Sequence, residues 1–225
     1  AMLDCLVGSE MCIRDRVAIR TFAQSDLQAY ADAASIPIIN ALTDLEHPCQ
    51  ALADYLTMQE AFGSLEGLTM TYVGDGNNVA HSLLIAGALL GVNVRIGCPA
   101  GFYPLEEVVD QARALAGGRC EISINEDPTE AVRGAHAVYT DVWASMGQEE
   151  EQSTRVQAFR GFCVNEALMS HADAKAIVLH CLPAHRGEEI SAEVMESSAS
   201  GIFDQAENRL HAQQALLATL LGAEG

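Results

Sequence analysis

After residue 66, most of the chain alternates between two patterns of apolar and polar positions, one typical of strands and one typical of helices. Short apolar runs of strand length are followed by stretches with helical spacing, and glycine or proline stands at the boundaries. The predicted strands are 68–74, 92–97, 120–124, 135–140 and 176–181, and the predicted helices between them include 81–90, 104–116 and 128–133. Strands that alternate with helices indicate an α/β fold with a doubly wound parallel sheet.

The first 66 residues and the C-terminus have a different pattern. A short strand is predicted at 36–40, and a long helix at 47–60 carries Pro48 in its first turn, where proline is well tolerated. The unpaired N–H groups at the start of that helix favour an anion. Residues 205–221 are predicted to form an amphipathic C-terminal helix.

Three unusual motifs directly follow predicted strands: GDGNN at 74–78, DVWASMG at 141–147 and HCLPAHRG at 180–187. Ligands of doubly wound sheets bind beyond the carboxyl ends of the strands. The shared position of the motifs therefore predicts a binding site at that edge of the sheet.

Taken singly, each motif has an ordinary explanation beside the functional one. GDGNN lacks the full G-x-G-x-x-G fingerprint, so it is either a tight turn or a ligand loop with Asn77 and Asn78 as amide contacts. His47 and Gln50 of HPCQ lie one turn apart, as a helix cap or as a shared ligand contact. Arg209 of AENR alone is typical of an exposed surface.

Cys181 at the end of a strand is either a nucleophile or a buried, inert thiol. His180 is a poor partner for it, because adjacent strand residues point to opposite faces.

The charge and cysteine content limit the class of protein. The formal net charge is -19, from 31 acidic and 12 basic residues, and this argues against nucleic acid as a partner. The sequence contains neither an apolar run of membrane-spanning length nor a signal-peptide pattern, so no membrane partner is expected. The 7 cysteines form no CxxC pair, which favours reduced thiols in a cytoplasmic protein and argues against a zinc site.

Together, HPCQ, GDGNN, DVWASMG, HCLP and AENR resemble the motifs of the ornithine carbamoyltransferases, in order and spacing, from about Val17 to the C-terminus. The resemblance implies transfer of a carbamoyl group from carbamoyl phosphate to the side-chain amine of L-ornithine, which gives citrulline and phosphate in arginine biosynthesis. It also implies two α/β domains joined by interdomain helices, a homotrimer at full length, and neither a metal nor an organic cofactor.

The resemblance assigns roles to residues at matching positions. The implied carbamoyl-phosphate ligands are Arg20, His47, Pro48, Cys49, Gln50, Cys181, Leu182 and Arg209. The implied ornithine contacts are Asn78, Asp141, Ser145 and Met146. Cys181, His47 and Arg20 are expected to act in catalysis without a covalent cysteine intermediate, and Trp143 is expected to pack as a prop beside Asp141.

Two departures from the family pattern affect the expected organisation. The family's S-T-R-T phosphate loop is absent, and residues 1–16 do not resemble the family, so we expect an unrelated leader there. We further expect a remnant of the carbamoyl-phosphate domain at 17–60, an ornithine-binding domain at 61–204, and a helix at 205–225 that packs back on the first domain. On this interpretation the chain alone is inactive, whereas a full-length protein is active.

Three other functions fit parts of the same pattern. A sister carbamoyltransferase would act on aspartate, putrescine or acetylornithine, although an acid at Asp141 favours a free α-amino group. A nucleotide-linked dehydrogenase would need the complete glycine fingerprint. A non-catalytic homologue would not need to keep Arg20, His47, Asp141 and Cys181.

Overall fold

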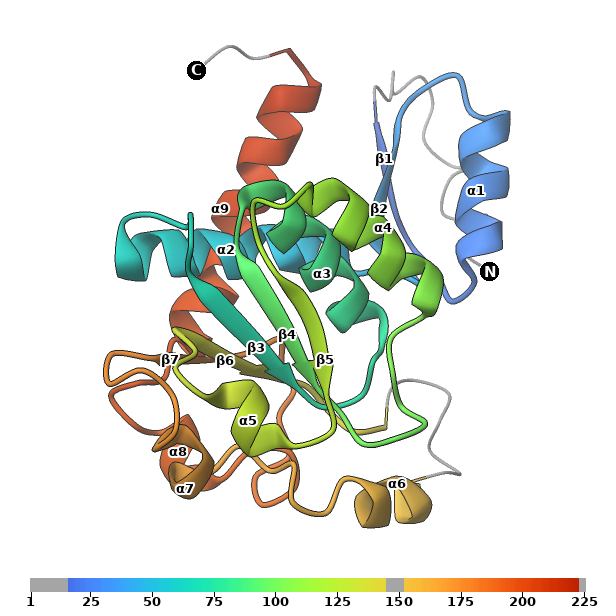
Figure 1. Ribbon diagram of the computed structural model, residues 1–225. Helices are drawn as coiled ribbons and strands as arrows, with labels where there is room; N and C mark the ends of the chain where they lie inside the picture. Colours follow the sequence, from blue (N-terminus) through green and yellow to red (C-terminus); the bar gives the residue numbers. More distant parts are fainter. Residues whose placement is uncertain (1–15, 145–151, 223–225) are drawn as a thin grey trace.

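The computed structural model describes residues 16–144 and 152–222, which form two parallel sheets with helices around them (Figure 1). The smaller sheet pairs β1 (Val17–Arg20) with β2 (Ile38–Leu42), and α1 (Gln24–Ala33) connects the two strands. The larger sheet has the order β5-β4-β3-β6-β7. Its strands are β3 (Thr69–Val73), β4 (Asn93–Gly97), β5 (Ile122–Asn125), β6 (Ala137–Thr140) and β7 (Ile177–His180).

Helices lie on both faces of the larger sheet, so the predicted doubly wound α/β fold is confirmed. On one face lie α2 (Pro48–Phe62), α3 (Asn78–Leu90) and α4 (Glu106–Ala116), and α9 (Ile202–Leu220) packs against α2 (Figure 1). On the other face lie the shorter helices α5 (Pro128–Val132), α7 (Glu166–Met169) and α8 (Ala192–Met195), whereas α6 (Gln152–Ala158) lies beyond the carboxyl ends of the strands.

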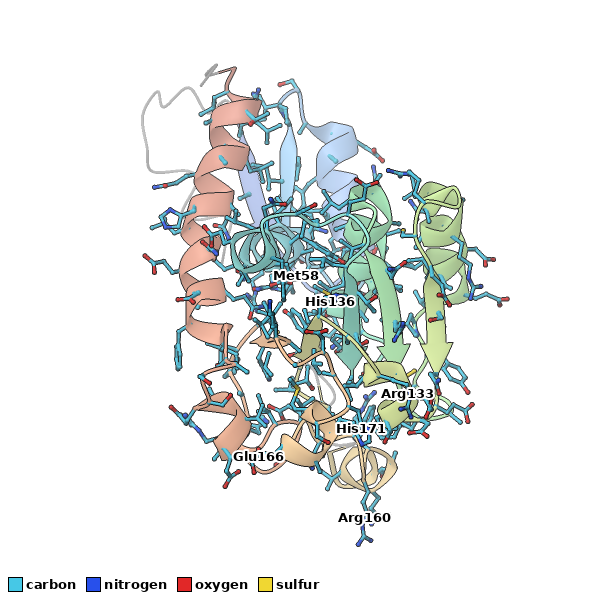
Figure 2. The ribbon with its side chains drawn as sticks, turned by 60° about the vertical axis from the view of Figure 1, so that its left-hand side comes forward. Met58, Arg133, His136, Arg160, Glu166 and His171 are labelled. Carbon is cyan, nitrogen blue, oxygen red and sulfur yellow. The ribbon has the colours of Figure 1, made fainter. Side chains whose placement is uncertain are left out.

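Each face of the larger sheet has its own hydrophobic core, because successive strand residues point to opposite faces. In β6, Tyr139 packs with the α2, α3 and α4 side, whereas Val138 packs with the α5, α7 and α8 side. Figure 2 shows Met58 of α2 in the interior, whereas Arg160 and Glu166 point outward. Burial on both faces is strongest in the central strands β3 and β6, whose residues are all buried.

Element boundaries differ from the predicted ones at several places. The helix expected from residue 81 begins at Asn78, because the side chain of Asn77 accepts hydrogen bonds from the N–H groups of Val79 and Ala80 and caps the first turn. The last helix begins at Ile202, so the AENR motif lies inside it and does not open it. The predicted strand 120–124 is shifted to Ile122–Asn125.

None of the helices in the described ranges, 16–144 and 152–222, is both long enough and apolar enough to cross a membrane. In the same ranges the cysteines are free thiols, as the sequence predicted.

Candidate functional site

The three motifs come together at the carboxyl ends of β3, β6 and β7, as the shared strand-end position predicted. Asp141 follows β6 directly and is buried. Its Oδ2 atom accepts a hydrogen bond from Asn77 Nδ2 at 2.9 Å, and its Oδ1 atom accepts one from the Cys181 thiol at 3.0 Å. The backbone N–H of Val142 also donates to Oδ1, at 2.8 Å. One carboxylate therefore joins the ends of three neighbouring strands.

Asn77 faces Asp141 because of its place at the start of α3. Its Oδ1 atom accepts from the first backbone N–H groups of the helix, so its Nδ2 atom points toward Asp141. Asn78, the predicted ornithine contact, instead donates to the carbonyl oxygen of Thr43 at 2.6 Å. Asn78 therefore lies where the segment after β2 meets α3. Ser145 and Met146 lie outside the described residues.

The thiol of Cys181 is not activated as a nucleophile in this arrangement. Burial raises the pKa of Cys181 well above its usual value, and the neighbouring Asp141 raises it further. The thiol thus stays protonated near neutral pH and donates to the carboxylate. Of the two interpretations left open by the sequence, the structure favours the inert thiol.

A ring nitrogen of His180 lies within 4.8 Å of the Cys181 sulfur, closer than opposite strand faces predict, but both ring nitrogens bond to other groups and support the segment that follows. The Nδ1 atom of His180 accepts from the N–H of Leu182 at 2.8 Å, so Nε2 carries the proton and donates to Glu189 Oε1 at 3.1 Å. Leu182 has a φ of 59°, a left-handed conformation that costs a non-glycine residue about 1–2 kcal/mol. Such conformations are concentrated at functional sites.

A second group of predicted residues surrounds the start of α2. His47 is the N-cap residue of this helix and Pro48 occupies its first turn. The Cys49 thiol donates to the carbonyl oxygen of Asn40 at 3.3 Å. Arg209, from α9, donates through Nη1 to Gln50 Oε1. The exposed Arg20, at the end of β1, lies close enough for its charge to act on His47.

His47 is neutral at physiological pH in this surrounding. Its pKa is lowered to about 4, chiefly by burial and also by the positive charges of Arg209 and Arg20. Its Nδ1 atom is buried and has no hydrogen-bond partner among the described residues. A buried polar atom without a partner is rare away from binding sites, so His47 is suited to contact a ligand.

Sequence reasoning missed a buried ion pair beside this site. Arg155 of α6 donates to Asp75 Oδ2 at 2.7 Å and to the carbonyl oxygen of Trp143 at 3.0 Å. Trp143 is buried and stacks on Phe159 at 5.7 Å, which confirms its expected role as a prop. Only Asp75 carried a sequence signal, through its place in GDGNN.

The described part of the chain brings possible metal ligands together in two places, Asp141–His180–Cys181 and His185–Glu188–Glu189. In the first, both ring nitrogens of His180 and the Cys181 thiol already make hydrogen bonds within the protein. The geometry is therefore that of a hydrogen-bonded cluster.

Comparison with known families identifies the family to which this fold belongs. The model of the aspartate/ornithine carbamoyltransferase Asp/Orn-binding domain matches residues 66–220, and that of the carbamoyl-P-binding domain matches residues 5–60. The chain belongs to this carbamoyltransferase family. The second match begins at residue 5 and so includes most of residues 1–16, where the sequence led us to expect an unrelated leader.

Relatives and solved structures agree with the family assignment. The ornithine carbamoyltransferase of Prochlorococcus marinus (strain MIT 9313) is 72% identical over 96% of the chain and 67% of its own length. That of Parasynechococcus marenigrum (strain WH8102) is 73% identical over 92% of the chain and 65% of its own length. The chain thus spans about two thirds of the length of these relatives.

Two solved structures of ornithine carbamoyltransferases have the same fold. The ornithine carbamoyltransferase from Gloeobacter violaceus has a TM-score of 0.86 at 55% identity, over 92% of this chain and 70% of that one. The ornithine carbamoyltransferase from Pyrococcus furiosus has a TM-score of 0.90 at 47% identity, over 95% of this chain and 68% of that one.

Proposed function

We propose that the chain carries most of the active site for carbamoyl transfer from carbamoyl phosphate to the side-chain amine of L-ornithine. The observation that carries this proposal is the presence of two unlike groups that both contact the start of α3. A buried acid, Asp141, lies at the strand ends, and the neutral His47, at the start of α2, is within reach of the positive charges of Arg209 and Arg20. The first complements an ammonium group, and the second complements a phosphate and a polarised carbonyl group.

In this proposal, the α2 group holds carbamoyl phosphate. Arg20 and Arg209 supply forked donors for the phosphate, and His47 contacts the carbonyl oxygen, where negative charge develops. Gln50 holds Arg209 in place through the hydrogen bond between them. Pro48 and Cys49 belong to the same turn and shape it.

The strand-end group holds ornithine. Asp141 pairs with the α-amino group, and Asn78, Ser145 and Met146 complete the contacts that the resemblance implies. Cys181 and Leu182 lie where the neutral side-chain amine meets the carbamoyl carbon. The new C–N bond forms, the C–O bond to phosphate breaks, and the proton lost by the amine passes to the departing phosphate. Positioning two bound reactants accounts for much of the rate.

We also propose the larger organisation that the resemblance implies. Residues 17–60 belong to the carbamoyl-phosphate domain, 61–204 form the ornithine domain, and 205–225 return to the first domain. The packing of α9 against α2 supports the last part. We propose a homotrimer in the cytoplasm, which sedimentation and cell fractionation would test.

The function is tested by measuring product formation with a panel of amines. We expect citrulline from ornithine, and no product from acetylornithine, putrescine or aspartate. The assay is run on the 225-residue chain and on a version extended to the length of its relatives with the S-T-R-T loop. We expect activity only in the extended version. Citrulline from the shorter chain would contradict the expected inactivity, and carbamoylation of another amine alone would contradict the proposed substrate.

Asp141→Ala tests the division of the site into two halves. We expect it to weaken ornithine binding at least tenfold, because an ammonium loses its counter-charge, and to leave carbamoyl-phosphate binding nearly unchanged. Titrating each ligand separately measures this, with Asp127→Asn as the control, since Asp127 only caps α5. Equal losses for both ligands would contradict the assigned role.

A further inference from the structure

A carboxyl group is buried beneath the two halves of the site. Asp54 lies on α2, one turn after Gln50, and its side chain is fully buried. Its Oδ1 atom accepts hydrogen bonds from Gln50 Nε2 and from Gln205 Nε2, each at 2.6 Å. The buried hydroxyl group of Tyr139 faces the same carboxyl group. Burying a carboxyl group away from water is costly, so its retention calls for a specific role.

The two glutamines extend from Asp54 toward different halves of the site. On one side, Gln50 Oε1 accepts a hydrogen bond from Arg209. On the other side, Gln205 Oε1 accepts one from the backbone N–H of His180 at 2.8 Å, directly before Cys181. A continuous chain of hydrogen bonds therefore runs from Arg209 through Asp54 to the end of β7.

The direction of this chain depends on the group at its centre. A carboxylate oxygen accepts hydrogen bonds and cannot donate them, whereas a glutamine amide does both. Each glutamine must therefore turn its NH₂ group toward Asp54 and its oxygen outward. Both outer partners, the Arg209 guanidinium and the His180 N–H, are donors and require an oxygen there. A glutamine turned the other way would place its NH₂ group against an outer partner that is itself a hydrogen-bond donor.

The balance of charge around Asp54 is consistent with this role. The pKa of Asp54 is raised to about 7, because burial outweighs the hydrogen bonds from Gln50 and Gln205 that oppose the rise. The hydroxyl group of Tyr139 and the charge of Arg209 also oppose it. The acceptor at Oδ1 is retained in both protonation states, because a proton can reside on Oδ2.

We propose that Asp54 is a positioning residue that orients Gln50 and Gln205 and thereby aligns the two halves of the site. Through Gln50 it holds Arg209 for carbamoyl phosphate, and through Gln205 it holds the backbone next to Cys181. This inference rests on the proposed function of those halves.

The same two helices supply a matched control. Asn208, also buried on α9, donates to Thr57 Oγ1 at 3.0 Å and to Glu60 Oε2 at 2.7 Å on α2. These bonds join α2 to α9 as those of Asp54 do, but they lead away from the site. A substitution of Asn208 therefore weakens the helix pair and leaves the chain of hydrogen bonds from Arg209 to His180 intact.

The experiment compares Asp54→Leu, Asp54→Asn and Asn208→Leu in the version extended to the length of the relatives. The measurements are the Kd of carbamoyl phosphate, the KM of ornithine, kcat and the melting temperature. We expect Asp54→Leu to raise both the Kd and the KM about tenfold or more, because misplaced contacts reduce binding and rate strongly. Asp54→Asn should stay within about threefold of the wild type, since its amide oxygen accepts both hydrogen bonds.

Asn208→Leu should lower the melting temperature and leave the Kd and the KM unchanged. The proposal is overturned if Asn208→Leu raises both constants as much as Asp54→Leu, or if Asp54→Leu leaves them unchanged. If Asp54→Leu does not fold, Gln205→Met replaces it, and it should raise the KM of ornithine more than the Kd of carbamoyl phosphate; no change in either would overturn the proposal. If the wild type itself binds neither ligand, the proposed function fails, and this inference fails with it.

Discussion

Replacing Asp54 with asparagine is expected to change how the stability of the chain depends on pH. Burial raises the pKa of Asp54 to about 7 in the folded chain, against 3.8 for the ordinary group. Between these values the folded state binds more protons than the unfolded state, so the unfolding free energy of the wild type falls as the pH rises. The loss begins near pH 4 and is complete above pH 7.

The size of the effect follows from the two pKa values. They differ by about 3, and one pKa unit corresponds to about 1.4 kcal/mol, so the ionised carboxylate lowers the stability by about 4 kcal/mol. Asparagine has no such titration. The unfolding free energy of Asp54→Asn minus that of the wild type should therefore rise by about 4 kcal/mol between pH 4 and pH 8.

Urea denaturation at several pH values and constant ionic strength measures this difference. The fluorescence of Trp143, the only tryptophan of the chain and a buried one, reports unfolding. The quantity to compare is the difference in unfolding free energy between the two proteins. Other groups titrate in the same pH window, and their contributions cancel in this difference when they lie apart from Asp54. A difference that stays constant with pH would refute the reasoning, since Asp54 would then keep one protonation state throughout.

Three further substitutions test other parts of the structure. His47→Asn should remove a titration of the opposite sign. The pKa of His47 is lowered from 6.5 to about 4, so the unfolding free energy of the wild type falls by about 3 kcal/mol as the pH falls from 6.5 through 4. The same denaturation series measures this change. Arg155→Met should lower the unfolding free energy by about 3–5 kcal/mol in urea denaturation, because the buried charge of Asp75 loses its ion pair with Arg155. An equal loss of unfolding free energy in Arg155→Lys would point to packing instead. Gly76→Ala places a Cβ atom 2.1 Å from the backbone nitrogen of Pro104, and it should lower the unfolding free energy by about 1–3 kcal/mol; an unchanged melting temperature would contradict this close approach.

The larger sheet was predictable because its strands are buried on both faces. All five residues of β3 are buried, and the β-branched and aromatic residues of this short segment favour a strand covered on both faces. Elements that bury little carried no such signal. In β1, exposed and half-buried residues alternate over only four positions, and α1 buries only Leu27. Neither was predicted, because their packing depends on each other and not on a local pattern.

The site was predictable only where its residues stand at the ends of strands. Asp141 and Cys181 come together because parallel neighbouring strands end at the same edge, a rule that needs no knowledge of tertiary contacts. Arg155 and Asp75 are 80 residues apart, and Gln205 and Asp54 are 151 apart. A buried polar residue is satisfied by a partner that local sequence does not indicate, so these contacts had to come from the structure.

The hydrogen bonds of Asp141 bear on the choice between ornithine and its acetylated form. Oδ1 already accepts two hydrogen bonds, from Cys181 and Val142, whereas Oδ2 accepts one from Asn77. A carboxylate oxygen has about two acceptor directions, so Oδ2 retains one that no described residue uses. An ammonium group uses it with full charge complementarity, whereas an acetylated amine offers a single neutral N–H and adds bulk. This geometry supports the proposal that Asp141 binds a free α-amino group, on electrostatic grounds and independently of the names of the relatives.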